Sequence, residues 1–120
     1  MDTFELWIGC EPGDVSTARH ALHGWLGGRG LSRDMVDAVT LATHEAVLNA
    51  ATYAKPGASI KIRGRLEAEM MFVEVADRGS RPLSAVEDGL GHRLITGLMQ
   101  DVQTVSGPSG TTVRMSRPTA

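Results

Sequence analysis

Two polar side chains, Glu45 and Asn49, interrupt a run of alanine, valine and leucine in the middle of the chain. They are four residues apart, so on a helix both project from one face. A carboxylate and an amide inside an apolar helix cost free energy if they are buried without partners. The pair is either the solvent edge of an amphipathic helix or part of a site, and other segments must decide between the two.

The second chemical signal is Asp77-Arg78-Gly79, which follows a strongly apolar segment with a strand period. A carboxylate there is a hydrogen-bond acceptor at the rim of a sheet, and the glycine permits close approach by a flat ligand. Taken alone, the same pattern also describes many ordinary turns.

Two further segments combine glycine with a predicted element boundary. Gly89 and Gly91 precede a helical pattern, where they form either an anion site at a helix N-terminus or a hinge. Gly110 precedes Thr111 and Thr112 at the start of the last predicted strand. Each signal is weak alone, and their joint order along the chain strengthens all of them.

A metalloprotease interpretation of His44-Glu45 fails, because that motif needs a second histidine four residues after the first and Leu48 stands there. The same dipeptide is similar to the phospho-acceptor segment of sensor histidine kinases, which belongs to a separate helical hairpin. We therefore expect His44 to be a packed or exposed bystander.

The elements that must position these residues follow from hydrophobic periodicity. A first helix is predicted from an N-cap at Asp14 to Gly27, and a second from an N-cap at Ser32 to the turn at Lys55. A third helix follows Gly91. The expected strands are 3–9, 59–67, 70–76, 102–105 and 111–115. The order β-α-α-β-β-α-β-β predicts an α+β fold, a two-layer sandwich in which one mixed sheet carries its helices on a single face.

Composition sets the limits of this interpretation. A chain of 120 residues predicts a single domain over 1–120. A net charge of −2 argues against direct nucleic-acid binding, and the absence of a long apolar run argues against a membrane span. The lone Cys10 cannot form an internal disulfide and the first residues do not resemble a signal peptide, so we expect a cytoplasmic location.

Four segments taken in order resemble a known superfamily. LATHEAVLNAATYA, VADRG, GLGHRLITGL and GTTVRM are similar to the N, G1, G2 and G3 boxes of the ATP-binding fold shared by DNA gyrase, histidine kinases and mismatch-repair ATPases (GHKL). The β-α-α opening most resembles bacterial anti-sigma-factor serine/threonine kinases. The resemblance covers nearly the whole chain.

The resemblance implies a role for each candidate residue. Glu45 would be the general base, and Asn49 would hold Mg²⁺ between the ATP phosphates. Asp77 would accept a hydrogen bond from the adenine amino group.

The remaining candidates are glycines and a threonine. Gly79 would let the adenine ring lie against the backbone, while Gly89 and Gly91 would form the lid and face the phosphates. Thr111 would support the adenine pocket, with Thr112 as the alternative register.

The chain also departs from the family pattern. Tyr53 replaces a histidine that usually follows the N box, and Thr52 stands where histidine kinases often carry a phosphate-binding lysine. The G1 box lacks its second glycine. The segment between Gly79 and Gly89 is short, which predicts a short lid.

The resemblance implies an anti-sigma factor that is also a serine/threonine kinase, with a sigma factor and a small antagonist protein as partners, and it points to a homodimer. The alternative is a nucleotide-binding regulator that acts by protein contact alone, which the short lid favours. A detached histidine kinase catalytic domain fits the opening segment less well.

Overall fold

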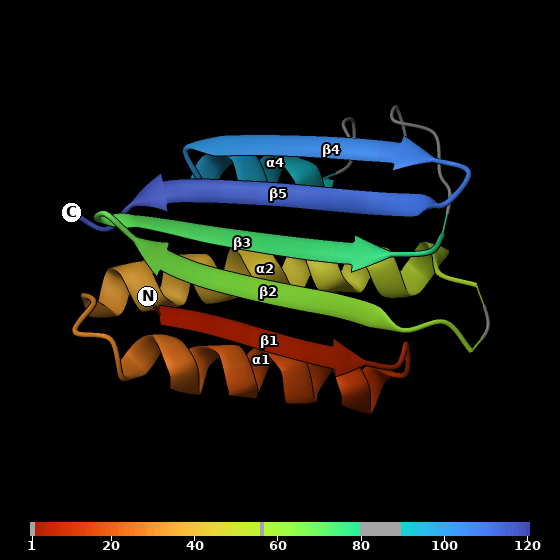
Figure 1. Ribbon diagram of the computed structural model, residues 1–120, viewed down its shortest axis with the longest axis horizontal. Coiled ribbons are helices and arrows are strands. Elements are labelled where there is room, and N and C mark those ends of the chain that lie inside the picture. Colours follow the sequence, from red (N-terminus) through yellow and green to blue (C-terminus); the bar gives the residue numbers. More distant parts are fainter. Residues whose placement is uncertain (1, 56, 80–89) are drawn as a thin grey trace.

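The protein is built on one five-stranded sheet with the strand order β1-β2-β3-β5-β4 (Figure 1). The computed structural model describes residues 2–55, 57–79 and 90–120. The strands are β1 (Asp2–Ile8), β2 (Ile60–Glu67), β3 (Met70–Asp77), β4 (Asp101–Gly107) and β5 (Gly110–Pro118). The helices of the described part are α1 (Pro12–Gly27), α2 (Arg33–Tyr53) and α4 (Leu90–Leu98).

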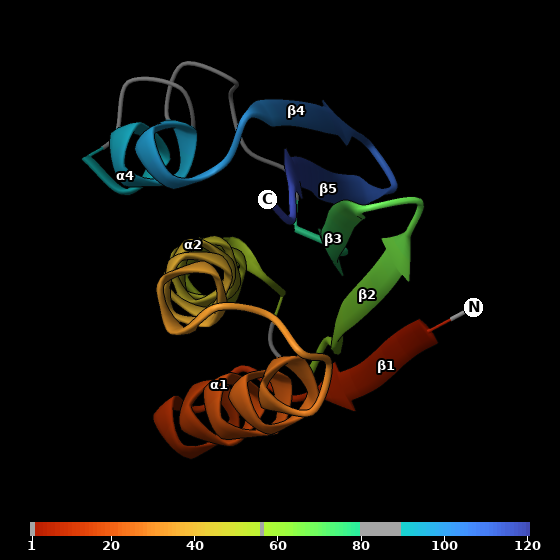
Figure 2. The same ribbon diagram turned by 90° about the vertical axis from the view of Figure 1, so that its left-hand side faces the viewer.

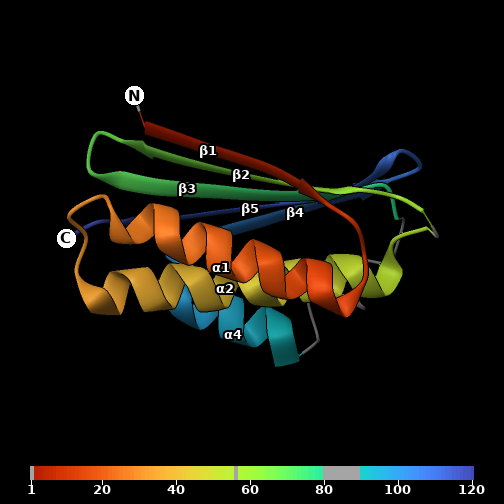
Figure 3. The same cartoon turned by 90° about the horizontal axis from the view of Figure 1, so that it is seen from below.

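These helices form a single layer against one face of the sheet, and the other face is open (Figures 2 and 3). The element order and the two-layer α+β architecture are therefore confirmed. In the described ranges, no helix combines the length and the apolar character that a bilayer span requires.

The sheet is antiparallel throughout the described strands, and the prediction of a mixed sheet is wrong. The crossover from β3 through α4 does bring β4 back in the direction of β3. However, β5 pairs with both strands and lies between them, so the two parallel strands never become neighbours.

Alternation along the strands places apolar residues under the helix layer. The inward residues of β3 and β5 are buried and mostly apolar, including Met71, Val73, Val75, Val113 and Met115. The rows become polar at one shared end, where Asp77 and Thr111 are register partners and both are buried. Buried polar groups at the end of an apolar row need partners, and their position draws attention to this end of the sheet.

The helix starts agree with prediction in one case and differ in the other. Ser32 caps α2 as expected, because its Oγ accepts the Met35 N–H at 3.2 Å. By contrast, α1 begins at Pro12 with Glu11 as its N-cap, so the predicted N-cap at Asp14 is wrong. Asp14 lies inside the first turn, where its carboxylate accepts the Glu11 N–H at 3.1 Å. Proline fits the first helical position because its missing N–H would have no partner there.

We predict that Ser32→Ala destabilises the protein, because the first turn of α2 loses the acceptor for Met35 N–H. The free energy of unfolding should fall by about 1 kcal/mol in urea titrations. Ser59→Ala, at an exposed position outside the helices, is the matched control and should change little. An equal loss in both variants would contradict a capping role.

Candidate functional site

Glu45 and Asn49 lie beside the start of α4, at a position where that helix has no side chain. A Cβ built on Gly91 would lie 3.1 Å from Glu45 Oε2 and 3.4 Å from Asn49 Nδ2. Both side chains are partly buried. The fold therefore brings together residues that are more than forty positions apart, and the missing Cβ leaves room between their polar groups.

The start of α4 adds a second property to this place. The first turn of a helix has backbone N–H groups without helical partners, and its N-terminus attracts negative charge. Gly91 is the second residue of α4, so these N–H groups lie beside Glu45 and Asn49. The predicted lid residue Gly89 lies outside the described residues.

Asp77 forms a second cluster, at the end of β3. Its side chain is buried, and Oδ1 accepts the Gly79 N–H at 2.6 Å. A Cβ on Gly79 would overlap the carbonyl group of Tyr53, the last residue of α2. Gly79 must therefore be glycine for the strand end to lie against the helix end.

Helix α2 joins the two clusters. Glu45, Asn49 and Tyr53 follow each other at intervals of four residues, so they lie along one side of the helix. One end of this side contacts Gly91 and the other contacts Gly79. The arrangement can hold an elongated ligand along α2, with one end at Asp77 and the other at Asn49.

Thr111, rather than Thr112, faces the buried side of β5. Thr111 pairs with Asp77 in register and is 1% exposed, whereas Thr112 pairs with Ala76 and points to the opposite face. Thr111 Oγ1 donates to the Gly79 carbonyl at 3.0 Å and lies 2.8 Å from Ser106 Oγ. Gly110 allows the start of β5 to lie against the end of β3, because a Cβ on residue 110 would overlap the Asp77 carbonyl oxygen.

Cys10 lies close enough to the Asp77 cluster to be affected by its charge. Burial raises the pKa of the Cys10 thiol above its ordinary value, and the negative charges of Asp14, Asp77 and Glu11 add to the effect. The thiol donates to the Ala58 carbonyl at 3.3 Å. Cys10 is therefore a protonated hydrogen-bond donor at neutral pH, not a thiolate nucleophile.

His44 lies against α1 rather than beside Gly91. It lines a small cavity between α1 and α2 together with Thr40 and Thr43. Its buried Nδ1 and the two threonine hydroxyls have no partner within the described ranges. His44 is thus a packed residue, as expected, whereas its neighbour Glu45 lies beside Gly91 of α4.

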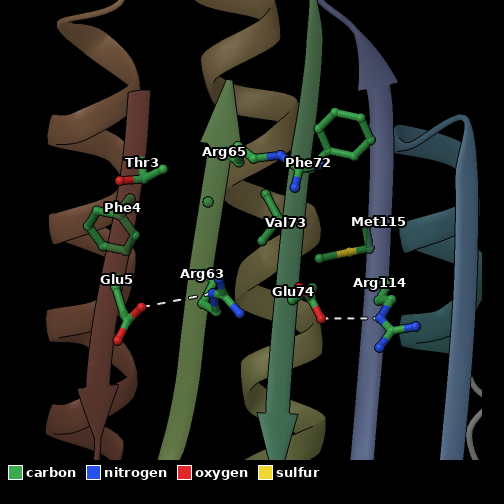
Figure 4. Close-up of a pocket in the computed structure, with 11 residues that line it drawn as sticks. Thr3, Phe4, Glu5, Arg63, Arg65, Phe72, Val73, Glu74, Arg114 and Met115 are labelled. Carbon is green, nitrogen blue, oxygen red and sulfur yellow. Dashed lines mark hydrogen bonds and ion pairs between the residues drawn. The ribbon is translucent and has the colours of Figure 1, made fainter. Parts of the chain in front are cut away.

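A hollow of about 270 Å³ lies on the opposite, open face of the sheet (Figure 4). Its charged side chains pair with each other: Arg63 lies 3.8 Å from Glu5, and Arg114 lies 3.1 Å from Glu74. Arg65 stacks over Phe72 at 4.3 Å. None of the predicted site residues that the structure describes lines this hollow, and its paired, largely exposed charges are typical of a solvated sheet face.

A model of the histidine kinase-like ATPase domain matches residues 9–117, which is nearly the whole chain. The chain belongs to the histidine kinase-like ATPase domain family. It is therefore an ATP-binding type of domain, and the resemblance to the GHKL superfamily is confirmed. A search of curated protein sequences returns no match.

Solved structures share this fold. The RsbU and RsbW domains of Rv1364c from Mycobacterium tuberculosis match with a TM-score of 0.79 at 21% identity, over 98% of this chain and 34% of that one. A blue-light activated histidine kinase of Erythrobacter litoralis matches with a TM-score of 0.66 at 21% identity, over 93% of this chain and 42% of the kinase. This histidine kinase-like ATPase domain thus spans between a third and a half of the length of these two proteins.

Sequence reasoning overlooked two contributors to the site. The strand expected over 102–105 ends one residue before Ser106, although counting outward from the β4–β5 turn pairs Ser106 with Thr111. The Tyr53 backbone was overlooked because the contact involves a carbonyl group, which the residue type does not reveal.

We predict that Gly91→Ala weakens ATP binding, because its methyl group would enter the space between Glu45 and Asn49. The dissociation constant measured by calorimetry should rise roughly tenfold. Gly97→Ala in the same helix is the control, since a Cβ there meets no described atom within 4 Å. If Gly91→Ala binds ATP as tightly as the control, the site does not include this place.

Proposed function

We propose that this domain is an ATP-dependent serine/threonine kinase and anti-sigma factor that phosphorylates a small antagonist protein. The observation that supports the proposal best is the position of Glu45 and Asn49 around Gly91, on the same side of α2 as the Asp77 cluster. The shared fold with a structure that contains an RsbW domain supports a regulatory role.

The residues of the site fit ATP and Mg²⁺. A carboxylate accepts several hydrogen bonds, so Asp77 can bind both the Gly79 N–H and the adenine amino group. Asn49 offers an amide oxygen of the kind that Mg²⁺ prefers, next to space that a Cβ at Gly91 would fill. When bound, Mg²⁺ would neutralise phosphate charge; the N–H groups at the start of α4 face the same place.

In this mechanism Glu45 acts on the acceptor rather than on the nucleotide. Its carboxylate takes the proton of the attacking serine hydroxyl as that oxygen forms a bond to the terminal phosphorus of ATP. The bond between that phosphorus and the oxygen bridging to ADP breaks, and ADP leaves. Asn49 lies one turn further along α2 and would bind the phosphate end of ATP, so that the terminal phosphate lies near Glu45.

A second candidate is a nucleotide-binding regulator that acts by protein contact alone. The observation in its favour is Thr52, whose hydroxyl donates to the Leu48 carbonyl at 2.9 Å on its own helix. Threonine carries no charge, and its hydroxyl is used within α2, so this position supplies no cation to a phosphate. The partners under either candidate are a sigma factor and an antagonist protein, with a homodimer as the proposed assembly and the cytoplasm as the proposed location.

We predict that Glu45→Ala separates the two candidates. If Glu45 is the general base, ATP affinity should stay near the parent value while phosphate transfer to an antagonist serine falls about 10²- to 10⁴-fold. Transfer is measured with radiolabelled ATP. Asp37→Ala, at an exposed position of the same helix, is the control and should keep full activity.

Two outcomes would count against the kinase. Unchanged transfer in Glu45→Ala would remove Glu45 from the catalytic step. A parent protein that binds ATP and a sigma factor, but labels no antagonist, would favour the contact-only regulator.

A further inference from the structure

We propose that Ser106 on β4 is a positioning residue for base selection at the nucleotide site. The inference rests on the proposed function, because it takes the Asp77 cluster as the adenine pocket. Ser106, Thr111 and Asp77 form one row across β4, β5 and β3, as register partners on neighbouring strands.

The direction of the hydrogen bonds in this row is fixed by chemistry. A carbonyl oxygen only accepts, so the Thr111 hydroxyl uses its one proton on the Gly79 carbonyl at 3.0 Å. The 2.8 Å contact between Ser106 and Thr111 then requires Ser106 to be the donor. Ser106 thereby holds the Thr111 hydroxyl in the orientation that reaches Gly79.

Gly79 depends on this support because it has no side chain of its own. Asp77 holds its N–H at 2.6 Å, Thr111 holds its carbonyl, and Tyr53 packs against its Cα. Hydrogen bonds to both the N–H and the carbonyl of Gly79 thus restrain the backbone after β3, and they restrain the Asp77 carboxylate with it. Buried hydrogen bonds of this kind specify one arrangement.

Fixing the Thr111 proton also affects which base the pocket accepts. Adenine presents an amino donor where guanine presents a carbonyl acceptor, and a carboxylate at Asp77 suits only the donor. While its proton is committed to Gly79, Thr111 cannot donate to a guanine carbonyl. Loss of Ser106 removes the donor that restrains the Thr111 hydroxyl and leaves only its bond to Gly79, so the pocket should discriminate less well against GTP.

Thr104 supplies a matched control on the same strand. It lies two residues before Ser106 on the same side of β4 and pairs with Val113, one row away. Its hydroxyl is buried and has no partner in the part of the chain that the structure describes. Thr104→Val therefore removes a hydroxyl from β4 without removing a hydrogen bond to any described residue.

The test measures ATP and GTP dissociation constants by calorimetry for the parent, Ser106→Ala, Ser106→Thr and Thr104→Val. We expect Ser106→Ala to weaken ATP binding about three- to tenfold and to lower the preference for ATP over GTP by a similar factor. Ser106→Thr should restore both values, and Thr104→Val should leave both unchanged. An unaltered preference in Ser106→Ala, or an equal change in Thr104→Val, would overturn the inference.

A second measurement distinguishes failure of this inference from failure of the proposed function. Amide hydrogen exchange at Gly79 in the free protein should be about three- to tenfold faster in Ser106→Ala than in Thr104→Val. If the parent binds neither nucleotide, the proposed function fails and base selection fails with it. If the parent binds ATP but Gly79 exchange is unchanged in Ser106→Ala, Ser106 does not position this backbone.

Discussion

The contact between Gly79 and the Tyr53 carbonyl determines how the rest of the site is arranged. It brings the end of β3 against the end of α2, and a Cβ on residue 79 would prevent it. Gly91 of α4 also lies close to α2, beside the side chains of Glu45 and Asn49, which precede Tyr53 by eight and four residues. Two residues without side chains therefore bring a strand and a second helix against one side of α2, where Glu45 and Asn49 provide the polar groups.

The two faces of the sheet differ in burial and polarity. Under the helices, the inward rows are apolar along most of their length and become polar at Asp77 and Thr111. On the open face, charges such as Glu74 and Arg114 pair with each other in solvent. Buried polar groups that meet at one edge provide directional recognition, whereas exposed ion pairs contribute little to binding or stability. This contrast supports the proposal that the nucleotide is recognised on the helix-covered face.

Sequence patterns predicted most of this fold because periodicity and capping are local. The Ser32 cap and the order of the described helices and strands follow from neighbouring residues. The antiparallel pairing was not predictable in this way, because it depends on the insertion of β5 between β3 and β4. The approach of Gly91 to Glu45 is likewise tertiary, and composition carries no sign of it. The contact of Ser106 with Thr111 is local to the β4–β5 hairpin, so counting residues outward from its turn predicts it.

The most direct test of the account is a two-dimensional amide NMR titration of the protein with ATP and Mg²⁺. We predict that the Gly79, Gly91 and Thr111 signals shift together with one binding curve, because these residues line one ligand along α2. The signals of Arg63, Phe72 and Arg114 on the open face should stay in place. Shifts confined to the open face, or an unchanged spectrum at saturating ATP, would contradict a nucleotide site between α2, α4 and the end of β3.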